Sequence, residues 1–213
     1  MSISNEKVAG EMYFTANPNS EHHYQNFDFE LLGHYLHFKT DSGVFSKSTV
    51  DFGTRTMLTA LTKTTIEPGK VLDLGTGYGP VGIAIAKALR RQVDMSDVNE
   101  RALALARQNA DSNGVGDQVK IFQSDMYANI SDKYALILVN PPIRAGKVVV
   151  TTMLQEGINH LIPGGKLIAV LQKKQGAPSA QKNLLSTFGN VTTIHKDKGY
   201  YILESIYDPN SNI

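Results

Sequence analysis

The stretch VLDLGTGYG at residues 71–79 joins a short apolar run to a glycine-rich turn. Its first residues are typical of a buried strand, and a helix is expected directly after it, over residues 80–90. Glycines at such a turn let the backbone approach a ligand closely, and the N-terminus of the following helix favours an anionic group. This order predicts a ligand at the carboxyl end of a strand in an open α/β sheet.

Beyond this stretch, strand patterns and helix patterns alternate along the chain. The expected strands are residues 70–74, 92–97, 118–123, 134–139, 165–171, 190–195 and 200–207, and the further helices are residues 99–112, 148–161 and 178–188. The alternation predicts a mainly parallel seven-stranded sheet with helices on both faces. Only residues 196–199 separate the last two strands, so these two are expected to form an antiparallel hairpin at one edge.

The N-terminal part of the chain has a different pattern. Apolar residues alternate over residues 27–31 and 35–39, on either side of Leu32-Gly33-His34, which predicts a β-hairpin. A helix is expected over residues 49–61. The hairpin is therefore predicted as a small addition to the main sheet.

Length and composition favour one domain of ordinary globular character. The chain has 213 residues, 41% hydrophobic residues, no cysteine and a formal net charge of +1. We expect a single domain over residues 1–213, with an N-terminal extension over 1–66 and a cofactor-binding core over 67–213. The absence of cysteine excludes disulfides and thiolate metal sites, and the histidines show no metal-ligand spacing, so no metal is expected. No signal peptide or bilayer-spanning run is found, so we expect a cytoplasmic protein without membrane contact. Its oligomeric state is not determined by the sequence.

Acidic residues lie at or near the ends of the first two core strands. Asp73 stands inside its strand, before the first glycine, where a carboxylate has no role against pyrophosphate but would suit a ligand with an ammonium group. Asp97 ends the next strand and could accept hydrogen bonds from both hydroxyls of a ribose. It could instead cap the helix that begins near Asn99.

A third acid, Asp125, follows the third core strand. It could accept a hydrogen bond from the exocyclic amine of an adenine, with Val98 and Met126 on either side of the ring. Alternatively, it is a solvated carboxylate in a turn. Acids at three successive strand ends predict a nucleoside cofactor at this edge of the sheet.

The turn NPPI at residues 140–143 follows the apolar strand expected at 134–139. Proline fixes φ and lacks a backbone N–H group, so this turn is stiff and presents mainly acceptors. The Asn140 side-chain oxygen and the Pro141 carbonyl could accept both hydrogens of a planar amine, which would direct its lone pair toward a methyl donor. Catalysis would then depend on positioning and charge complementarity, without a covalent enzyme intermediate.

With both turns in view, the chain resembles class I S-adenosylmethionine-dependent methyltransferases, and more narrowly the small-domain, RsmC-like ribosomal RNA guanine-N2 enzymes. The resemblance covers about residues 25–207 and is carried by GVFS at 43–46, DFGT at 51–54, DLGTGYG at 73–79, DVN at 97–99 and NPP at 140–142. It implies a Rossmann-like class I methyltransferase fold. RsmC-like proteins often contain two related domains, and this chain holds one.

The resemblance also implies roles for individual residues. Asp73 and the glycines would hold the methionine part of S-adenosylmethionine, Asp97 its ribose and Asp125 its adenine. The implied cofactor-binding residues are Asp73, Gly75, Thr76, Gly77, Gly79, Asp97, Val98, Asp125, Met126 and Asn140. The implied catalytic residues are Asn140, Pro141 and Pro142. The expected substrate-binding residues are Phe45, Ser46, Ile143, Arg144 and Lys147.

Basic residues follow several strands at the same edge of the predicted sheet. They are Arg144, Lys147, Lys173 and Lys174, which Lys47 and Arg55 could join. Such a rim could bind phosphates of RNA, and binding would then depend on salt. Where many enzymes with this loop have an aromatic residue after the second proline, Ile143 offers an apolar contact to a base.

Several functions remain open at this point. The first is methylation of an exocyclic amine of RNA, most readily guanine N2 in ribosomal RNA or an assembling ribosomal subunit. The same loop could present an adenine N6 amine or a protein glutamine amide. Because Gly77, Gly79 and Gly82 also satisfy the dinucleotide-binding pattern, a nicotinamide-dependent oxidoreductase is a third possibility. A catalytically silent RNA-binding module is the fourth.

Overall fold

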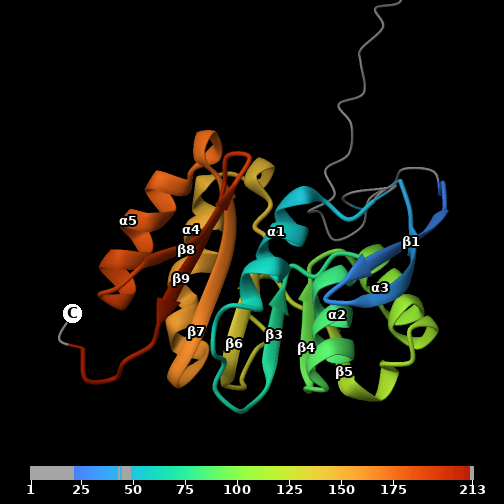
Figure 1. Cartoon of the computed structure of the whole chain (residues 1–213), viewed down its shortest axis with the longest axis horizontal. Coiled ribbons are helices and arrows are strands. Elements are labelled where there is room, and N and C mark those ends of the chain that lie inside the picture. The colour runs from blue at the N-terminus through green and yellow to red at the C-terminus, as the bar shows by residue number, and fades with distance from the viewer. Residues whose placement is uncertain (1–21, 43, 45–48, 212–213) are drawn as a thin grey trace, which may run out of the picture.

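The computed structural model describes residues 22–42, 44 and 49–211. A seven-stranded sheet runs through its centre, with strand order β5-β4-β3-β6-β7-β9-β8 (Figure 1). Its strands are β3 (Val71–Leu74), β4 (Val93–Asp97), β5 (Val119–Gln123), β6 (Tyr134–Val139), β7 (Leu161–Gln172), β8 (Thr192–Asp197) and β9 (Tyr200–Ile206). Strands β3 to β7 are parallel, and β9 pairs antiparallel with both β7 and β8. The predicted sheet and its antiparallel edge hairpin are confirmed.

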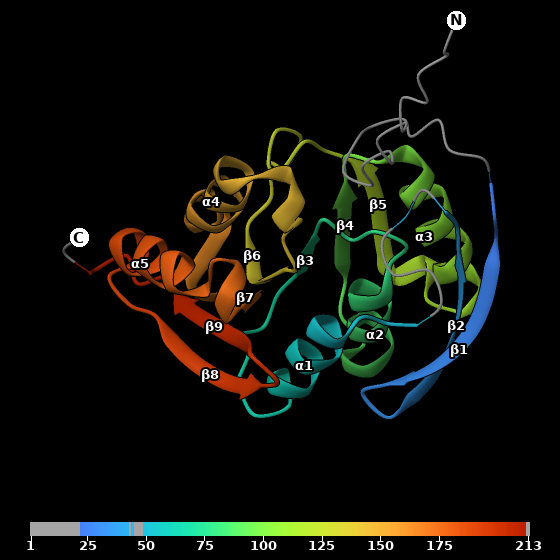
Figure 2. The ribbon, with the colours of Figure 1, turned by 90° about the horizontal axis from the view of Figure 1, so that it is seen from above.

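Helices cover both faces of the sheet (Figure 2). One face carries α1 (Phe52–Leu61), α2 (Pro80–Leu89) and α3 (Glu100–Ser112), and the other carries α4 (Lys147–Gln155) and α5 (Ala177–Phe188). None of the helices within the described ranges combines the length and the apolar character needed to cross a bilayer.

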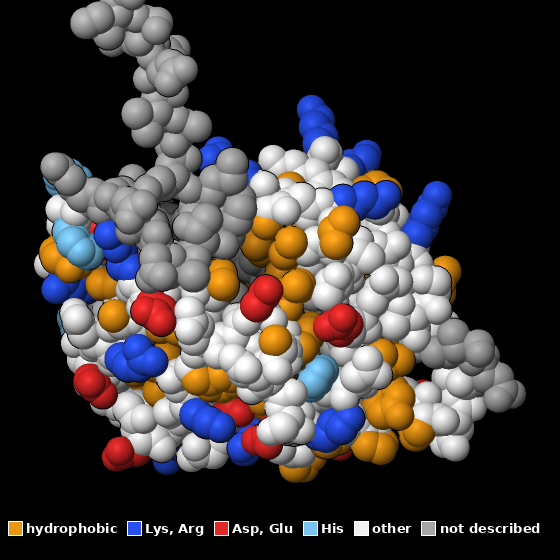
Figure 3. All heavy atoms as spheres, turned by 180° about the vertical axis from the view of Figure 1, so that it is seen from behind, with side chains coloured by type: hydrophobic (Ala, Val, Ile, Leu, Met, Phe, Trp, Pro, Cys, Tyr) orange, Lys and Arg blue, Asp and Glu red, His pale blue; other side chains and the backbone are white. Residues whose placement is uncertain are grey.

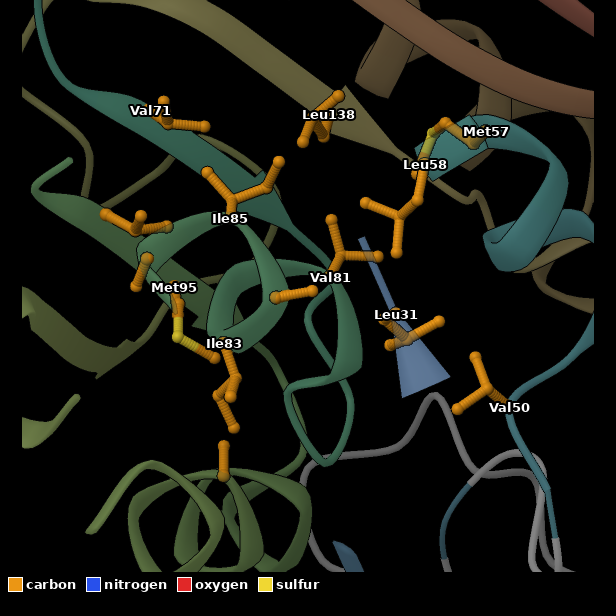
Figure 4. Packing of buried hydrophobic residues seen from close by; sticks show 14 of the residues in the cluster. Leu31, Val50, Met57, Leu58, Val71, Val81, Ile83, Ile85, Met95 and Leu138 are labelled. Atoms are coloured by element: carbon orange, nitrogen blue, oxygen red, sulfur yellow. The ribbon is translucent and has the colours of Figure 1, made fainter. Parts of the chain in front are cut away.

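The central strands are apolar on both sides because both sides are covered. Successive residues of a strand point to opposite faces, so Val71 and Leu138 pack with α1 and α2, whereas Leu72 and Ile137 pack with α4 and α5. Figure 4 shows the first of these cores, where side chains of α1, α2, β4 and β6 meet. The same core includes Leu31 of the N-terminal hairpin, so the extension packs directly against the cofactor-binding core.

The predicted N-terminal hairpin consists of β1 (Gln25–Leu31) and β2 (His34–Thr40), a separate antiparallel pair. Its turn has two residues, Leu32 and Gly33, whose φ values of 49° and 79° are both left-handed. Such a turn matches the twist of the two strands that it joins. His34, which the sequence pattern assigns to the turn, therefore belongs to β2.

Two asparagines, Asn109 of α3 and Asn113 at its C-cap, hold this hairpin in place. Asn109 accepts a hydrogen bond from Lys39 N at 2.8 Å and donates one to Lys39 O at 3.0 Å. One helical turn later, Asn113 makes the same pair of bonds with His37, at 3.0 and 2.8 Å. Asn109 also donates to Tyr78 O in the glycine-rich turn at 2.9 Å. The hairpin is thereby tied to the loop that follows β3.

The region between α4 and β7 differs from the prediction. The helix expected to reach residue 161 ends at Gln155, a 3-10 helix follows over Glu156–His160, and β7 begins at Leu161, four residues early. Packing from distant residues explains the early end. Gly157 lies so close to Leu167 and Tyr127 that a Cβ atom there would stand 2.4 and 2.9 Å from them. The Tyr127 ring also stacks on His160, with ring centroids 4.7 Å apart.

Candidate functional site

A cavity of about 370 Å³ opens where β3, β4, β5 and β6 end. This volume is within the range of small-molecule sites, and the carboxyl edge of an open α/β sheet is their usual place. The predicted cofactor-binding residues that line it are Asp73, Gly75, Thr76, Gly77, Asp97, Val98, Asp125, Met126 and Asn140. Pro141 and Pro142 of the predicted catalytic turn line it as well.

Asp73 is buried at the inner end of the cavity, with 3% of its surface exposed. Its Oδ2 accepts hydrogen bonds from Thr76 Oγ1 at 2.5 Å and from Gly82 N at 2.8 Å. Burial, together with the nearby charge of Asp97, raises the pKa of Asp73 to about 6, although the two hydrogen bonds favour the ionised form. Because both bonds fall on Oδ2, the second carboxylate oxygen is left for a cationic group in the cavity.

Asp97 links the glycine-rich turn to the end of β4. Its Oδ2 accepts from Gly77 N at 2.8 Å and its Oδ1 from Asn99 N at 2.9 Å. The N-cap of α3 is Asn99, whose side chain accepts from Ala102 N at 3.2 Å. The helix-cap interpretation of Asp97 is therefore wrong. Burial raises the pKa of Asp97, against the lowering effect of hydrogen bonds from the backbone N–H groups of Asn99, Gly77 and Val98, and the carboxylate has acceptor capacity beyond these three bonds.

The turn after β5 places Asp125 and Met126 on the cavity wall. Met126 adopts a left-handed backbone conformation with φ of 48°. Ser124 holds the turn, because its Oγ donates to Met126 O at 2.8 Å and accepts from Asn129 N at 3.1 Å. A left-handed residue that is not glycine costs energy, and such residues cluster at functional sites.

Ser96 is a cavity-lining residue near the end of β4, and its Oγ is buried without a hydrogen-bond partner in the described part of the protein. The Ser96 carbonyl accepts from Gly75 N and Thr76 N, at 2.8 and 2.9 Å, so the backbone of this residue is satisfied while its hydroxyl is not. A buried hydroxyl without a partner is costly.

Asn140 directly follows β6 and is held by the N-cap and first turn of α1. Its Nδ2 donates to Thr54 Oγ1 at 3.1 Å and lies 3.3 and 3.4 Å from the two carboxylate oxygens of Asp51. Asp51 is the N-cap of α1 and accepts from Thr54 N at 3.1 Å. The amide nitrogen of Asn140 is thus occupied, and the acceptor that this side chain offers to a ligand is its Oδ1.

Asp51 and Thr54 both line the cavity, and sequence reasoning assigned them no role. Both residues belong to the DFGT motif at 51–54, which carries part of the family resemblance. The available signal was the aspartate at the start of a predicted helix, which is typical of an N-cap. An N-cap pattern alone does not reveal that the same carboxylate faces a residue 89 positions later.

Some predicted site residues lie elsewhere. Gly79 is not among the cavity-lining residues; it is the N-cap of α2, with φ of 98°, and it packs against Ile83 and Met95. The expected substrate contacts Ile143, Arg144 and Lys147 follow the proline turn, in a 3-10 helix over Ile143–Ala145 and at the start of α4, outside the cavity lining. Phe45, Ser46 and Lys47 lie outside the described residues.

Basic side chains gather at the edge where the parallel strands end. Figure 3 shows lysine and arginine side chains projecting from the upper edge of the molecule. Lys173 and Lys174 are exposed there, and Lys173 N donates to Gly199 O at 2.8 Å, which brings the β8–β9 turn beside them. Lys198 in that turn is exposed and lies 4.9 Å above the Phe52 ring of α1.

Arg55 does not join this rim as an exposed cation. It is half-buried, and its guanidinium lies 5.2 and 5.5 Å from the ring centroids of Phe52 and Phe29. No group of three or more His, Asp or Glu side chains in the described ranges is placed to hold a metal ion.

Comparison with known sequences gives matches along most of the chain. The family model "Methyltransferase small domain" matches residues 35–204. A Bacillus subtilis (strain 168) protein, "Uncharacterized protein YbxB", is 43% identical over 198 residues, which are 92% of this chain and 98% of that protein. The ribosomal RNA small subunit methyltransferase C of Vibrio parahaemolyticus is 30% identical over 189 residues, 86% of this chain and 53% of that protein. The chain thus spans about half the length of this second relative.

Comparison with solved structures gives the same fold. The Thermus thermophilus 16S rRNA N2 G1207 methyltransferase (RsmC), solved with AdoMet and guanosine, superposes with a TM-score of 0.78 at 23% identity. The match covers 86% of this chain and 50% of that one.

Proposed function

The chain belongs to the methyltransferase small domain family, and from this premise we propose that it methylates the N2 amine of a guanine in ribosomal RNA. The observation that carries the proposal is the placement of Asn140. Its amide nitrogen is held by Asp51 and Thr54, so its oxygen is the acceptor offered beside the cofactor turn.

The cofactor is S-adenosylmethionine. The cavity fits it in the chemistry of its donors and acceptors: Asp73 offers a free carboxylate oxygen for the ammonium group, Asp97 accepts from the ribose hydroxyls and Asp125 accepts from the adenine amine. When bound, S-adenosylmethionine supplies a methyl group attached to a sulfonium centre, which makes that group an electrophile.

The residues of the chain act by orienting the amine. The lone pair of a guanine N2 amine is delocalised into its ring, so the amine is a weak nucleophile. Asn140 Oδ1 and the Pro141 carbonyl accept its two hydrogens, which draws the nitrogen toward tetrahedral geometry and aims its lone pair at the methyl carbon. The excess proton leaves after transfer, so no histidine with a shifted pKa is required.

Ribosomal RNA is proposed as the substrate for two reasons. The relative from Vibrio parahaemolyticus is named a ribosomal RNA small subunit methyltransferase. The exposed lysines beside the cavity would bind phosphates on either side of a flipped-out base, with Ile143 as an apolar contact to that base. An adenine N6 amine or a glutamine amide would offer a similar planar nitrogen. A protein that acts on ribosomal RNA or on an assembling ribosomal subunit would work in the cytoplasm.

The proposal is tested by product analysis. The protein is incubated with stripped ribosomal RNA and isotopically labelled S-adenosylmethionine, and the RNA is digested to nucleosides for mass analysis. We expect N2-methylguanosine. Labelled N6-methyladenosine would transfer the proposal to the adenine N6 amine, and label in ribosomal protein, in a parallel incubation with whole ribosomal subunits, would transfer it to a protein amide. Binding of RNA without any transfer would indicate a catalytically silent module instead. Mass mapping of ribosomal RNA from cells that lack the protein would then locate the modified nucleotide.

Cofactor affinity is expected to fall as the pH drops through 6. The ionised form of Asp73 attracts the ammonium group, and its pKa of about 6 means that the carboxyl is protonated below that pH. The dissociation constant Kd for S-adenosylmethionine should rise roughly tenfold per pH unit below 6, measured by calorimetric titration between pH 5 and 7.5. Because the folded pKa is above the ordinary 3.8, this group favours the folded state at low pH, and its protonation will not unfold the protein.

The control for this prediction is Asp73→Asn. This variant should bind the cofactor more weakly and with little dependence on pH. An unchanged pH profile in the variant would mean that another group titrates.

RNA binding is expected to depend on salt through the lysines beside the cavity. We expect the combined replacement of Lys173, Lys174 and Lys198 by glutamine to make the slope of log K against log[salt] about 2 less negative, since each phosphate contact on single-stranded RNA contributes about 0.7. Lys63→Gln is the matched control, because Lys63 is an exposed lysine beyond the opposite end of α1. Equal slopes in the wild type and the triple variant would mean that RNA phosphates do not contact these three lysines.

A further inference from the structure

We propose that Asp51 is a positioning residue for methyl transfer: its carboxylate fixes the side-chain amide of Asn140 so that the oxygen, and not the nitrogen, faces the target amine. This inference rests on the proposed function, because it assigns a task to a neighbour of the proposed catalytic side chain. Asp51 lies on the cavity wall together with Thr54 and Asn140.

The orientation of an asparagine amide is decided by its partners. The oxygen and nitrogen ends have nearly the same shape, so an amide can turn over unless its neighbours distinguish a donor from an acceptor. Thr54 Oγ1, at 3.1 Å, can donate or accept and therefore distinguishes nothing. Asp51, at 3.3 and 3.4 Å, only accepts when ionised. Only the carboxylate therefore requires the nitrogen end of Asn140 to face it.

Turning the amide over would place Asn140 Oδ1 against two carboxylate oxygens. This repulsion, added to the lost charge-assisted hydrogen bonds, disfavours the inverted amide. The negative charge on the nitrogen side also polarises the amide, which makes its oxygen a stronger acceptor for the amine hydrogens. Asp51 thus acts on the target through Asn140.

The backbone holds the carboxylate in this position. Asp51 is the N-cap of α1, and its Oδ1 is fixed by the bond from Thr54 N at 3.1 Å. Thr54 is in turn 2% exposed, so the first turn of α1 is tightly packed. The N-terminal extension, which the sequence presented as an addition to the core, thereby contributes to the reaction centre.

The informative variant is Asp51→Asn. Asparagine is also a good N-cap, so α1 should keep its stability. A neutral amide can present either end to Asn140 and no longer selects one orientation. We expect kcat to fall about tenfold, with Kd for S-adenosylmethionine and the melting temperature unchanged. Asp132→Asn is the matched control, because it removes the same charge at an exposed position paired with Lys70 and should leave kcat unchanged.

Two further measurements separate positioning from other roles. In an Asn140→Ala background, Asp51→Asn should cause no additional loss of kcat. If Asp51 acted independently of Asn140, the second substitution would lower kcat by the same factor as it does in the wild type. In NMR spectra without cofactor, the Asn140 side-chain NH₂ signals, assigned by their absence in Asn140→Ala, should exchange with water at least several-fold faster in Asp51→Asn than in wild type or Asp132→Asn.

The outcomes distinguish this inference from the proposed function. If the wild type methylates guanine and Asp51→Asn is equally active, the inference is overturned while the function stands. If no RNA is methylated but the NH₂ exchange of Asn140 depends on Asp51, the function fails and the orienting contact stands. Unchanged exchange in Asp51→Asn overturns the inference whatever the activity.

Discussion

Replacement of Asn140 by alanine is expected to lower kcat by about 10²–10³-fold, with Kd for S-adenosylmethionine changed by no more than a few-fold. The loss has a direct physical reason. The alanine variant lacks the oxygen that accepts a hydrogen of the target amine, so the lone pair of the amine is no longer directed at the methyl carbon. The carboxylates and backbone groups that would hold the cofactor belong mainly to β3, to the end of β4 and to the turns after β3, β4 and β5, which the substitution leaves in place.

Single-turnover kinetics with saturating RNA would measure this loss, and calorimetric titration would measure cofactor affinity. Asn183→Ala is the control, since Asn183 donates to Thr151 on the α4 side of the sheet and is not among the cavity-lining residues. Wild-type turnover in Asn140→Ala would remove this residue from the mechanism. A parallel loss of cofactor affinity would show that Asn140 supports binding more than transfer.

The second large effect is expected from Gly79, through stability. Its φ of 98° is unfavourable for any other residue, and an added Cβ would stand 2.9 Å from the terminal atoms of both Ile83 and Met95. Both of those side chains are fully buried, so neither can move without disturbing the core. We expect Gly79→Ala to lower the free energy of unfolding by about 2–4 kcal/mol, measured by urea denaturation.

Gly77→Ala is the matched comparison within the same turn. Gly77 is also left-handed, with φ of 58°, but a Cβ there would meet nothing within 4 Å. We expect a loss of about 1 kcal/mol from the backbone alone. Because Gly77 lines the cavity, this variant should bind S-adenosylmethionine more weakly. Equal stability losses in the two variants would contradict the packing role assigned to Gly79.

Much of the fold was predictable because local patterns and tertiary structure agree. The strands β3 and β6 are mainly apolar on both faces, and the turn at residues 75–79 has glycines wherever the backbone is left-handed. Each of these features is determined by residues that are consecutive in the sequence. The end of α4 is not determined locally. Leu167 and Tyr127 pack on Gly157 and stop the helix, and both lie at least ten residues away in the sequence.

The predicted site shows the same division. Acids at strand ends meet at one edge because parallel strands end together, so Asp73, Asp97 and Asp125 could be grouped in advance. The three glycines of the turn look alike in sequence, yet packing against Met95 gives Gly79 a different role. Likewise, the contact between Asp51 and Asn140 depends on how α1 packs on the sheet, which no local pattern encodes.

Asn109 and Asn113, in α3 and at its C-cap, have a consequence for how this molecule meets other molecules. By bonding to both backbone groups of His37 and Lys39, they occupy the side of β2 that faces away from β1. A strand with open backbone groups is a template for pairing with a neighbouring chain. On β2 the backbone groups of His37 and Lys39 are already bonded to side-chain amides. Strand exchange or fibre growth through this hairpin would therefore have to start from β1.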